Sequence, residues 1–272
     1  MRQILPFLAT LVLIAGASVP EGPIPVPQPK PDAPTGAPAA PETLPEADAA
    51  KPEQKPTQEG AAEPDGKPKA EGEAEITLSP EVAACEADLA ALGVTFERIA
   101  PVTGEDGCGF SPAYRFTGLS DGVKLEPAAE MRCETGLALA RLVRDTAAPA
   151  VAALDAAEAG DGKTVKARKL ASVRQASAFV CRPRNNQAGA KMSEHSTGRA
   201  IDLSAFVLSD GTEIAIEPRG DDHTIIGAFQ AAVRGGACLH FTTVLGPGAD
   251  AHHDDHLHVD LAERRGGYRI CQ

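Results

Sequence analysis

The chain has 272 residues and a formal net charge of −12 at pH 7. This charge repels phosphate backbones, and two tyrosines without a tryptophan leave few rings on which unpaired bases could stack, so we expect no nucleic-acid partner. The one long apolar run, near the N-terminus, is shorter than the ~20 residues that span a bilayer, so we expect no integral membrane segment in the mature chain.

The N-terminal residues 1–17 have the pattern of a secretory signal peptide. Arg2 provides the positive charge, residues 4–13 form a short apolar core, and the small residues 15–17 form a cleavage site. We therefore expect a secreted protein that is located in the periplasm. An uncleaved N-terminal anchor is the alternative.

Residues 18–76 differ in composition from the rest of the chain. They contain 14 of the 23 prolines, 12 acidic residues, 5 lysines and no aromatic residue. Such a segment buries too little apolar surface to offset the entropy lost on ordering, so we expect a disordered linker rich in Pro, Ala and Glu. It is either a tether that projects the domain or a solvated spacer. The remaining residues, 77–272, suffice for one domain with a core.

The six cysteines all lie within residues 77–272, and their spacing contains no CxxC pair. In an oxidising compartment this pattern predicts three disulfides rather than a metal site. Short sequence separations favour the pairs Cys85–Cys108, Cys133–Cys181 and Cys238–Cys271. The alternative is that one or two pairs stay reduced.

Residue periodicity predicts a fold that mixes helices with antiparallel strands. Helical spacing recurs in residues 80–92, 128–146 and 222–234, with Ser79 as the first N-cap and Gly235 as the end of the third helix. Strand-like segments cover residues 94–100, 172–180, 200–207, 212–217 and 256–261. Because helices and strands do not alternate regularly, we expect an α+β domain, a small antiparallel sheet flanked by helices.

Two histidine-bearing segments carry the candidate chemistry. They are residues 193–202 (SEHSTGRAID) and residues 252–260 (HHDDHLHVD), and each ends in a strand with one apolar and one polar face. If these strands are neighbours, Asp202 and His258 converge, and His195 reaches them from the preceding loop. Ser193 either orients His195 by a hydrogen bond or caps a turn.

This group of two imidazoles and one carboxylate favours Zn²⁺ as the bound ion. Three protein ligands leave a fourth position open for water, which is the arrangement of catalytic rather than structural zinc sites. The alternative interpretation is a histidine-rich, acidic surface loop.

Both segments resemble the metal motifs of a known superfamily. Residues 193–202 fit S-x-H-x-x-G-x-A-x-D, and residues 253–258 resemble the H-x-D-H-x-H segment of the zinc D-Ala-D-Ala metallopeptidases. More closely, residues 181–186 (CRPRNN), 243–247 (TVLGP) and 264–268 (RRGGY) resemble the bacterial extensin-like C-terminal domain. The resemblance covers most of the domain and implies a D-Ala-D-Ala metallopeptidase-like fold.

The resemblance also implies a function. Relatives include peptidases that hydrolyse peptide bonds in cell-wall peptidoglycan, so we expect a carboxypeptidase or endopeptidase whose partners are the peptide stems. The chain itself would act as a monomer. Its zinc ligands would be His195, Asp202 and His258. The alternative function is a non-catalytic module that holds zinc and binds peptidoglycan or has a structural role in the envelope.

The resemblance assigns two further kinds of site residue, catalytic and substrate-binding. The catalytic residues would be Asp255 and His253. The substrate-binding residues would be Arg184, Arg182 and His256. Asp255 would take a proton from zinc-activated water, unless a kink near His253 gives this role to Asp254. Arg184 or Arg182 would hold a substrate carboxylate, or both are ordinary surface arginines.

Overall fold

The computed structural model describes residues 79–272 except residues 161, 163 and 220–222. The predicted signal peptide and linker, residues 1–17 and 18–76, lie outside the described residues. The chain divides into the units Met1–Ala70 and Glu71–Gln272, and the second unit contains the whole described part. Within this part, no helix has the length and apolar character needed to cross a membrane.

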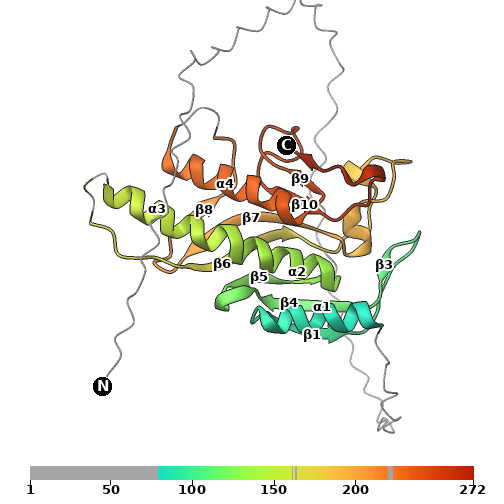
Figure 1. The fold of residues 1–272 in the computed structure, drawn as a ribbon. Helices are drawn as coiled ribbons and strands as arrows, with labels where there is room; N and C mark the ends of the chain where they lie inside the picture. The colour runs from blue at the N-terminus through green and yellow to red at the C-terminus, as the bar shows by residue number, and fades with distance from the viewer. Residues whose placement is uncertain (1–78, 161, 163, 220–222) are drawn as a thin grey trace, which may run out of the picture. The chain divides into compact units, whose positions relative to one another are not determined.

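Among the described residues, nine strands form one sheet (Figure 1). In spatial order they are β1 (Thr95–Ile99), β4 (Ala113–Gly118), β5 (Lys124–Met131), β6 (Leu170–Ser177), β7 (Ala200–Leu208), β10 (Leu257–Asp260), β9 (Thr243–Leu245) and β11 (Ile270–Cys271), with β8 (Glu213–Ala215) beside β7. Neighbours are antiparallel except for the parallel pairs β5–β6 and β9–β11. A separate short ladder joins β2 (Val102–Thr103) to β3 (Gly109–Phe110).

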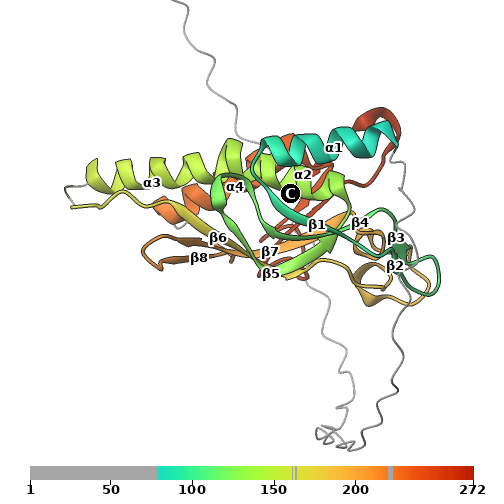
Figure 2. The same ribbon diagram turned by 90° about the horizontal axis from the view of Figure 1, so that it is seen from below.

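The four α-helices of the described part of the chain lie on one face of the sheet (Figure 2). They are α1 (Pro80–Ala91), α2 (Cys133–Leu142), α3 (Ala148–Gly160) and α4 (Ile225–His240), with the π-helical turn Val143–Ala147 between α2 and α3. The core lies between helices and sheet, where Leu139, Phe206 and Val233 are fully buried. The prediction of a domain that combines helices with a sheet is confirmed, and the sheet is mostly antiparallel. It is not the small, wholly antiparallel sheet expected, because it has nine strands and two parallel pairs.

The predicted helix over residues 128–146 is wrong at its start. Lys124–Met131 forms β5, in which Leu125, Ala129 and Met131 are the buried residues, as strand alternation requires. The helix begins at Cys133 instead.

The prediction that Gly235 ends the third helix is also wrong, because α4 continues to His240. Packing explains the neighbouring glycine. A Cβ atom at Gly236 would lie 2.3 Å from Oγ1 of Thr146 in the π-helical turn, so the close approach of α4 to this turn requires a residue without a side chain.

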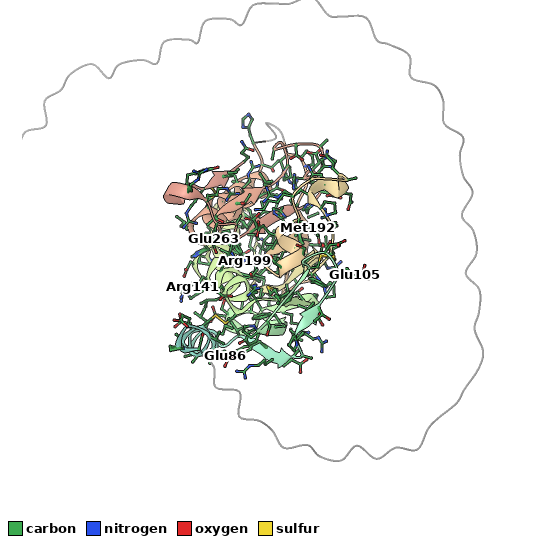
Figure 3. All side chains as sticks on the ribbon, turned by 90° about the vertical axis from the view of Figure 1, so that its right-hand side faces the viewer. Glu86, Glu105, Arg141, Met192, Arg199 and Glu263 are labelled. Atoms are coloured by element: carbon green, nitrogen blue, oxygen red, sulfur yellow. A yellow bond between two sulfur atoms is a disulfide. The ribbon has the colours of Figure 1, made fainter. Side chains whose placement is uncertain are left out.

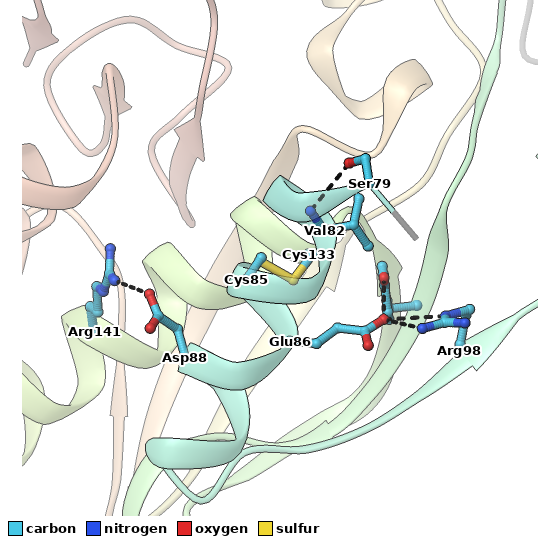
Figure 4. Close-up of a disulfide and its surroundings, with 9 residues drawn as sticks. Ser79, Val82, Cys85, Glu86, Asp88, Arg98, Cys133 and Arg141 are labelled. Carbon is cyan, nitrogen blue, oxygen red and sulfur yellow. Dashed lines mark hydrogen bonds and ion pairs between the residues drawn. A yellow bond between two sulfur atoms is a disulfide. The ribbon is translucent and has the colours of Figure 1, made fainter. Parts of the chain in front are cut away.

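Three disulfides join segments that are distant in the sequence. The bonds are Cys85–Cys133, Cys108–Cys181 and Cys238–Cys271. The predicted pairs Cys85–Cys108 and Cys133–Cys181 are therefore wrong, whereas the third pair is as predicted. Sequence separation misled the prediction because α1 packs on α2, which places Cys85 beside the first turn of α2 (Figure 4).

Candidate metal centre

The centre is built on the adjacent strands β7 and β10. The two strands pair antiparallel, and His258 lies directly opposite Asp202 in the register. Beyond the strand ends, Arg199 Nη1 donates to Oε1 of Glu263 over 2.9 Å, which ties the start of β7 to the segment after β10 (Figure 3). The adjacency on which the sequence prediction depended is therefore present.

His195 approaches the two strands from a single 3₁₀ turn, Glu194–Thr197. Ser193 caps this turn, since its Oγ accepts a hydrogen bond from the backbone N–H of His195 over 3.4 Å. Of the two roles considered for Ser193, the structure therefore shows the capping of a turn. The imidazole is oriented instead by the carbonyl oxygen of Ala178, 2.5 Å from Nδ1.

The turn ends at Gly198, which has the left-handed φ of 67°. A Cβ atom there would lie 2.7 Å from the ring of Phe110, so both conformation and packing favour glycine. Thr135 Oγ1 donates to the carbonyl of Gly198, and Arg132 Nε donates to that of Thr197, each over 2.9 Å. Contacts from α2 and β3 therefore hold the turn that carries His195.

Three ligand atoms converge at the centre. Nδ1 of His258 lies 2.8 Å from Oδ1 of Asp202, and Nε2 of His195 lies 3.2 Å from each of these two atoms. The three residues form a group in which every candidate ligand atom lies within 4.8 Å of the others. Only 1% of His195 and 4% of Asp202 are exposed, so the side chains of these two candidate ligands are buried.

The outer hydrogen bonds of both imidazoles favour metal binding by their inner nitrogens. The carbonyl of Ala178 can only accept, so Nδ1 of His195 carries the hydrogen and Nε2 keeps its lone pair. In the same way, Nε2 of His258 lies 3.1 Å from Oδ2 of Asp260, and an ionised carboxylate also only accepts. Two lone pairs and a carboxylate oxygen then face one point. This donor set fits a divalent cation such as Zn²⁺.

The pKa values follow from this crowding. Burial alone would raise the pKa of Asp202, but hydrogen bonds and charge from His195 and His258 hold it below its usual range. Burial opposes protonation of His258, yet the carboxylates of Asp202 and Asp260 raise its pKa to about 9.

A cavity of about 660 Å³ opens over the centre. Besides the three candidate ligands, its polar lining includes Arg182, Arg184, Glu194, Asp250, His252, His253, His256 and Arg264. Arg184 Nη2 lies 3.3 Å from Oε1 of Glu194, so the guanidinium of Arg184 is already in an ion pair. The side chain of Arg182 has no hydrogen bond or ion pair with any described residue, so it is the more available cation.

Two histidines of the loop before β10 face this cavity, and each is bound to an aspartate. His253 Nδ1 lies 2.7 Å from Oδ1 of Asp250, and His256 Nδ1 lies 2.8 Å from Oδ1 of Asp255. His256 Nε2 lies 3.6 Å from Oδ1 of Asp202, so this ring is next to the centre. Burial lowers the pKa of His253, although Asp250 opposes this shift.

The two candidate acids lie outside the cavity lining. The side chain of Asp255 is 93% exposed, and its carboxylate contacts the ring of His256 on the side away from Asp202. Asp254 lines a different hollow beside α4. The hydrogen bond from His256 lowers the pKa of Asp255, which makes this carboxylate a weaker proton acceptor.

Sequence reasoning gave no role to several polar residues around the centre. These residues are Thr243, Asp250, Asp260 and Arg264. Asp260 was visible on the polar face of its strand, two residues after His258, and alternation alone could have flagged it. Arg264 and Thr243 lie in the two segments that resemble the extensin-like domain, but only the folded chain brings them together beside the centre.

The described residues thus form an α+β domain with a buried His–Asp–His group on two paired strands. The chain belongs to the family described as Extensin-like protein C-terminus, whose sequence model matches residues 83–272. This confirms the extensin-like resemblance. No curated protein and no solved structure matches the chain. The likeness to zinc D-Ala-D-Ala metallopeptidases therefore stays a proposal.

Proposed function

We propose that this protein is an exported, zinc-dependent peptidase that hydrolyses peptide bonds in cell-wall peptidoglycan, as a carboxypeptidase or an endopeptidase. The observation that carries the proposal is the buried convergence of His195 Nε2, Asp202 Oδ1 and His258 Nδ1 beneath an open cavity. These residues would hold the zinc. When bound, zinc supplies a Lewis acid that polarises a carbonyl and lowers the pKa of water to ~7.

The two aspartate–histidine pairs support a proton-transfer role. With its Nδ1 hydrogen donated to Asp255, His256 presents the lone pair of Nε2 to the cavity, and we assign this atom as the proton acceptor. Asp255 then acts through His256 by holding its ring. We assign His253, held by Asp250, to hydrogen-bond the substrate beside the reacting bond.

The substrate class rests on the charge of the cavity. Peptide stems of peptidoglycan carry carboxylates, which an arginine can bind bidentately. Arg182 is the better candidate for this contact because the guanidinium of Arg184 already meets Glu194.

The disulfides support the proposed location. Three disulfides are consistent with a secreted protein, since such bonds persist in oxidising compartments. A periplasmic location, a signal peptide and a monomeric state are parts of the proposal.

A non-catalytic zinc-holding module that binds peptidoglycan is the second candidate. It is favoured by one observation, the 93% exposure of Asp255, which removes the expected carboxylate base from the cavity. Incubation of the full chain with purified murein, followed by mass spectrometry of the soluble products, separates the two. The peptidase proposal requires released peptides or amino acids that are absent with His195→Ala. Sedimentation with murein but no product supports the binding module.

A further inference from the structure

We propose that three residues outside the ligand set, Asp260, Thr243 and Arg264, fix which nitrogen of His258 binds the metal. We call them the outer brace. This inference rests on the proposed zinc site and concerns residues that the proposed chemistry does not use. It also gives a physical role to two of the family-like motifs, residues 243–247 and 264–268, which contribute one brace residue each.

The brace is a continuous line of hydrogen bonds that ends at His258. Arg264 Nη2 donates to Oγ1 of Thr243 over 2.6 Å, and the hydroxyl of Thr243 donates to Oδ1 of Asp260. The other oxygen of Asp260, Oδ2, lies 3.1 Å from Nε2 of His258. Register explains the contact, because Thr243 of β9 pairs directly with Asp260 of β10.

The direction of every bond in this line is set by its first member. A guanidinium has no acceptor, so the oxygen of Thr243 receives a hydrogen from Arg264 and turns its own hydrogen toward Asp260. Asp260 also accepts from the backbone N–H of Ala262 over 2.9 Å, so its Oδ1 receives two hydrogen bonds, one from Thr243 and one from the main chain. The ionised carboxylate then demands a hydrogen on Nε2 of His258, which leaves the lone pair on Nδ1.

Burial and further contacts hold the three residues of the outer brace in place. Asp260 and Thr243 are each only 4% exposed. Arg264 is held from two further sides, by the carbonyl of Thr242 at 3.0 Å and by the ring of Tyr268 at 5.7 Å from its centre. No described contact of Arg264 competes for its role as donor, so the brace keeps a hydrogen on Nε2 of His258 whether or not Nδ1 also carries one, and Nδ1 is the nitrogen left for the metal.

The decisive variant is Asp260→Asn, which has nearly the same size. Thr243 and the N–H of Ala262 would still donate to Oδ1 of the new side chain, so its amide group would face His258 and donate to Nε2. The neutral ring would then carry its hydrogen on Nδ1, the atom that must bind the metal. We expect zinc affinity to fall by about 10- to 100-fold, the usual effect of losing an outer partner of a ligand.

The matched pair Thr243→Val and Thr242→Val tests the rest of the brace. Both substitutions remove one hydroxyl, but that of Thr242 donates only to the backbone carbonyls of Asp260 and Ala262. Thr243→Val should weaken zinc binding by about 10-fold. Thr242→Val and Thr243→Ser should leave it within about threefold, below the range of outer-partner effects.

Zinc dissociation constants are measured on the full chain by competition with a chromophoric chelator, and the ¹⁵N shifts of the zinc-loaded His258 ring report the bound nitrogen. The inference predicts bonding through Nδ1 in the wild type, with affinity lost in Asp260→Asn. Zinc bound through Nε2, or equal affinity in Asp260→Asn, would overturn the brace and leave the proposed metal site intact. A wild type that binds no zinc would overturn both. Melting of the metal-free variants checks that each one folds.

Discussion

Substitution of Asp255 by asparagine should slow murein cleavage only about 1.4- to 5-fold. The ion pair that Asp255 forms with His256 once the ring has taken up a proton is exposed, and such pairs contribute ~0.2–1 kcal/mol. The carboxylate lies 2.8 Å from Nδ1 of His256 and is 93% exposed, so water replaces most of its interaction when it is lost. If Asp255 were itself the general base, the same change would cost ~10²–10⁴-fold. The two assignments therefore differ by more than an order of magnitude.

Two further variants serve as references for the effect of Asp255→Asn on the rate. His256→Ala removes the proposed proton acceptor and should cost ~10²–10⁴-fold. Asp254→Asn, which changes a similar acid in a different hollow, should change the rate by less than about twofold, as expected of a surface site. None of the three is a candidate zinc ligand, so zinc content should be unchanged.

The assay is the initial rate of product release from purified murein, with zinc per chain measured on the same samples. A loss of ~10²-fold or more in Asp255→Asn, with zinc retained, would refute the inference from exposure and restore Asp255 as the base. If Asp254→Asn abolished cleavage while Asp255→Asn stayed active, the catalytic carboxylate would instead be Asp254.

Two further predictions concern stability and titration. Gly198→Ala should destabilise the fold by about 2–5 kcal/mol in urea unfolding, from the left-handed backbone and the clash with Phe110, whereas Gly93→Ala, left-handed at φ 69° but with open space, should cost about 1–2 kcal/mol. Equal losses would contradict the packing argument. In Tyr268→Phe, ultraviolet titration should show the remaining phenol, Tyr114, ionising at about 12, because burial and an α1 carboxylate raise its pKa. The raised pKa means that the neutral phenol stabilises the folded state; this contribution is complete below pH ~10 and is lost as pH rises through about 12. Ionisation of Tyr114 near pH 10 would contradict the prediction.

The part of the centre that sequence could predict depends on strand alternation. Asp202 and His258 stand on polar faces of apolar-backed strands, and that local pattern is independent of the rest of the fold. The structure brings them together with His195, but their convergence depended on the pairing of β7 with β10, which residue spacing alone does not give. The roles of Asp254 and Asp255 also depended on the folded structure, because the loop before β10 decides which way each side chain points.

Two wrong predictions, the cysteine pairs and the end of α4, share one physical cause. The cysteine pairs depended on α1 packing against α2, and the length of α4 depended on how closely Gly236 approaches the π-helical turn. The outer brace likewise requires the adjacency of β9 and β10. Each is a tertiary contact with no local periodicity, so residue spacing could not reveal it.

The zinc content of the purified full chain tests the central claim most directly. Elemental analysis should find about one zinc per chain in the wild type, as three converging protein ligands require. His195→Ala should remove it, whereas His252→Ala, which changes an exposed cavity histidine outside the ligand group, should keep it. Stoichiometric zinc surviving in His195→Ala, or a wild type without zinc after incubation with excess metal, would contradict the account.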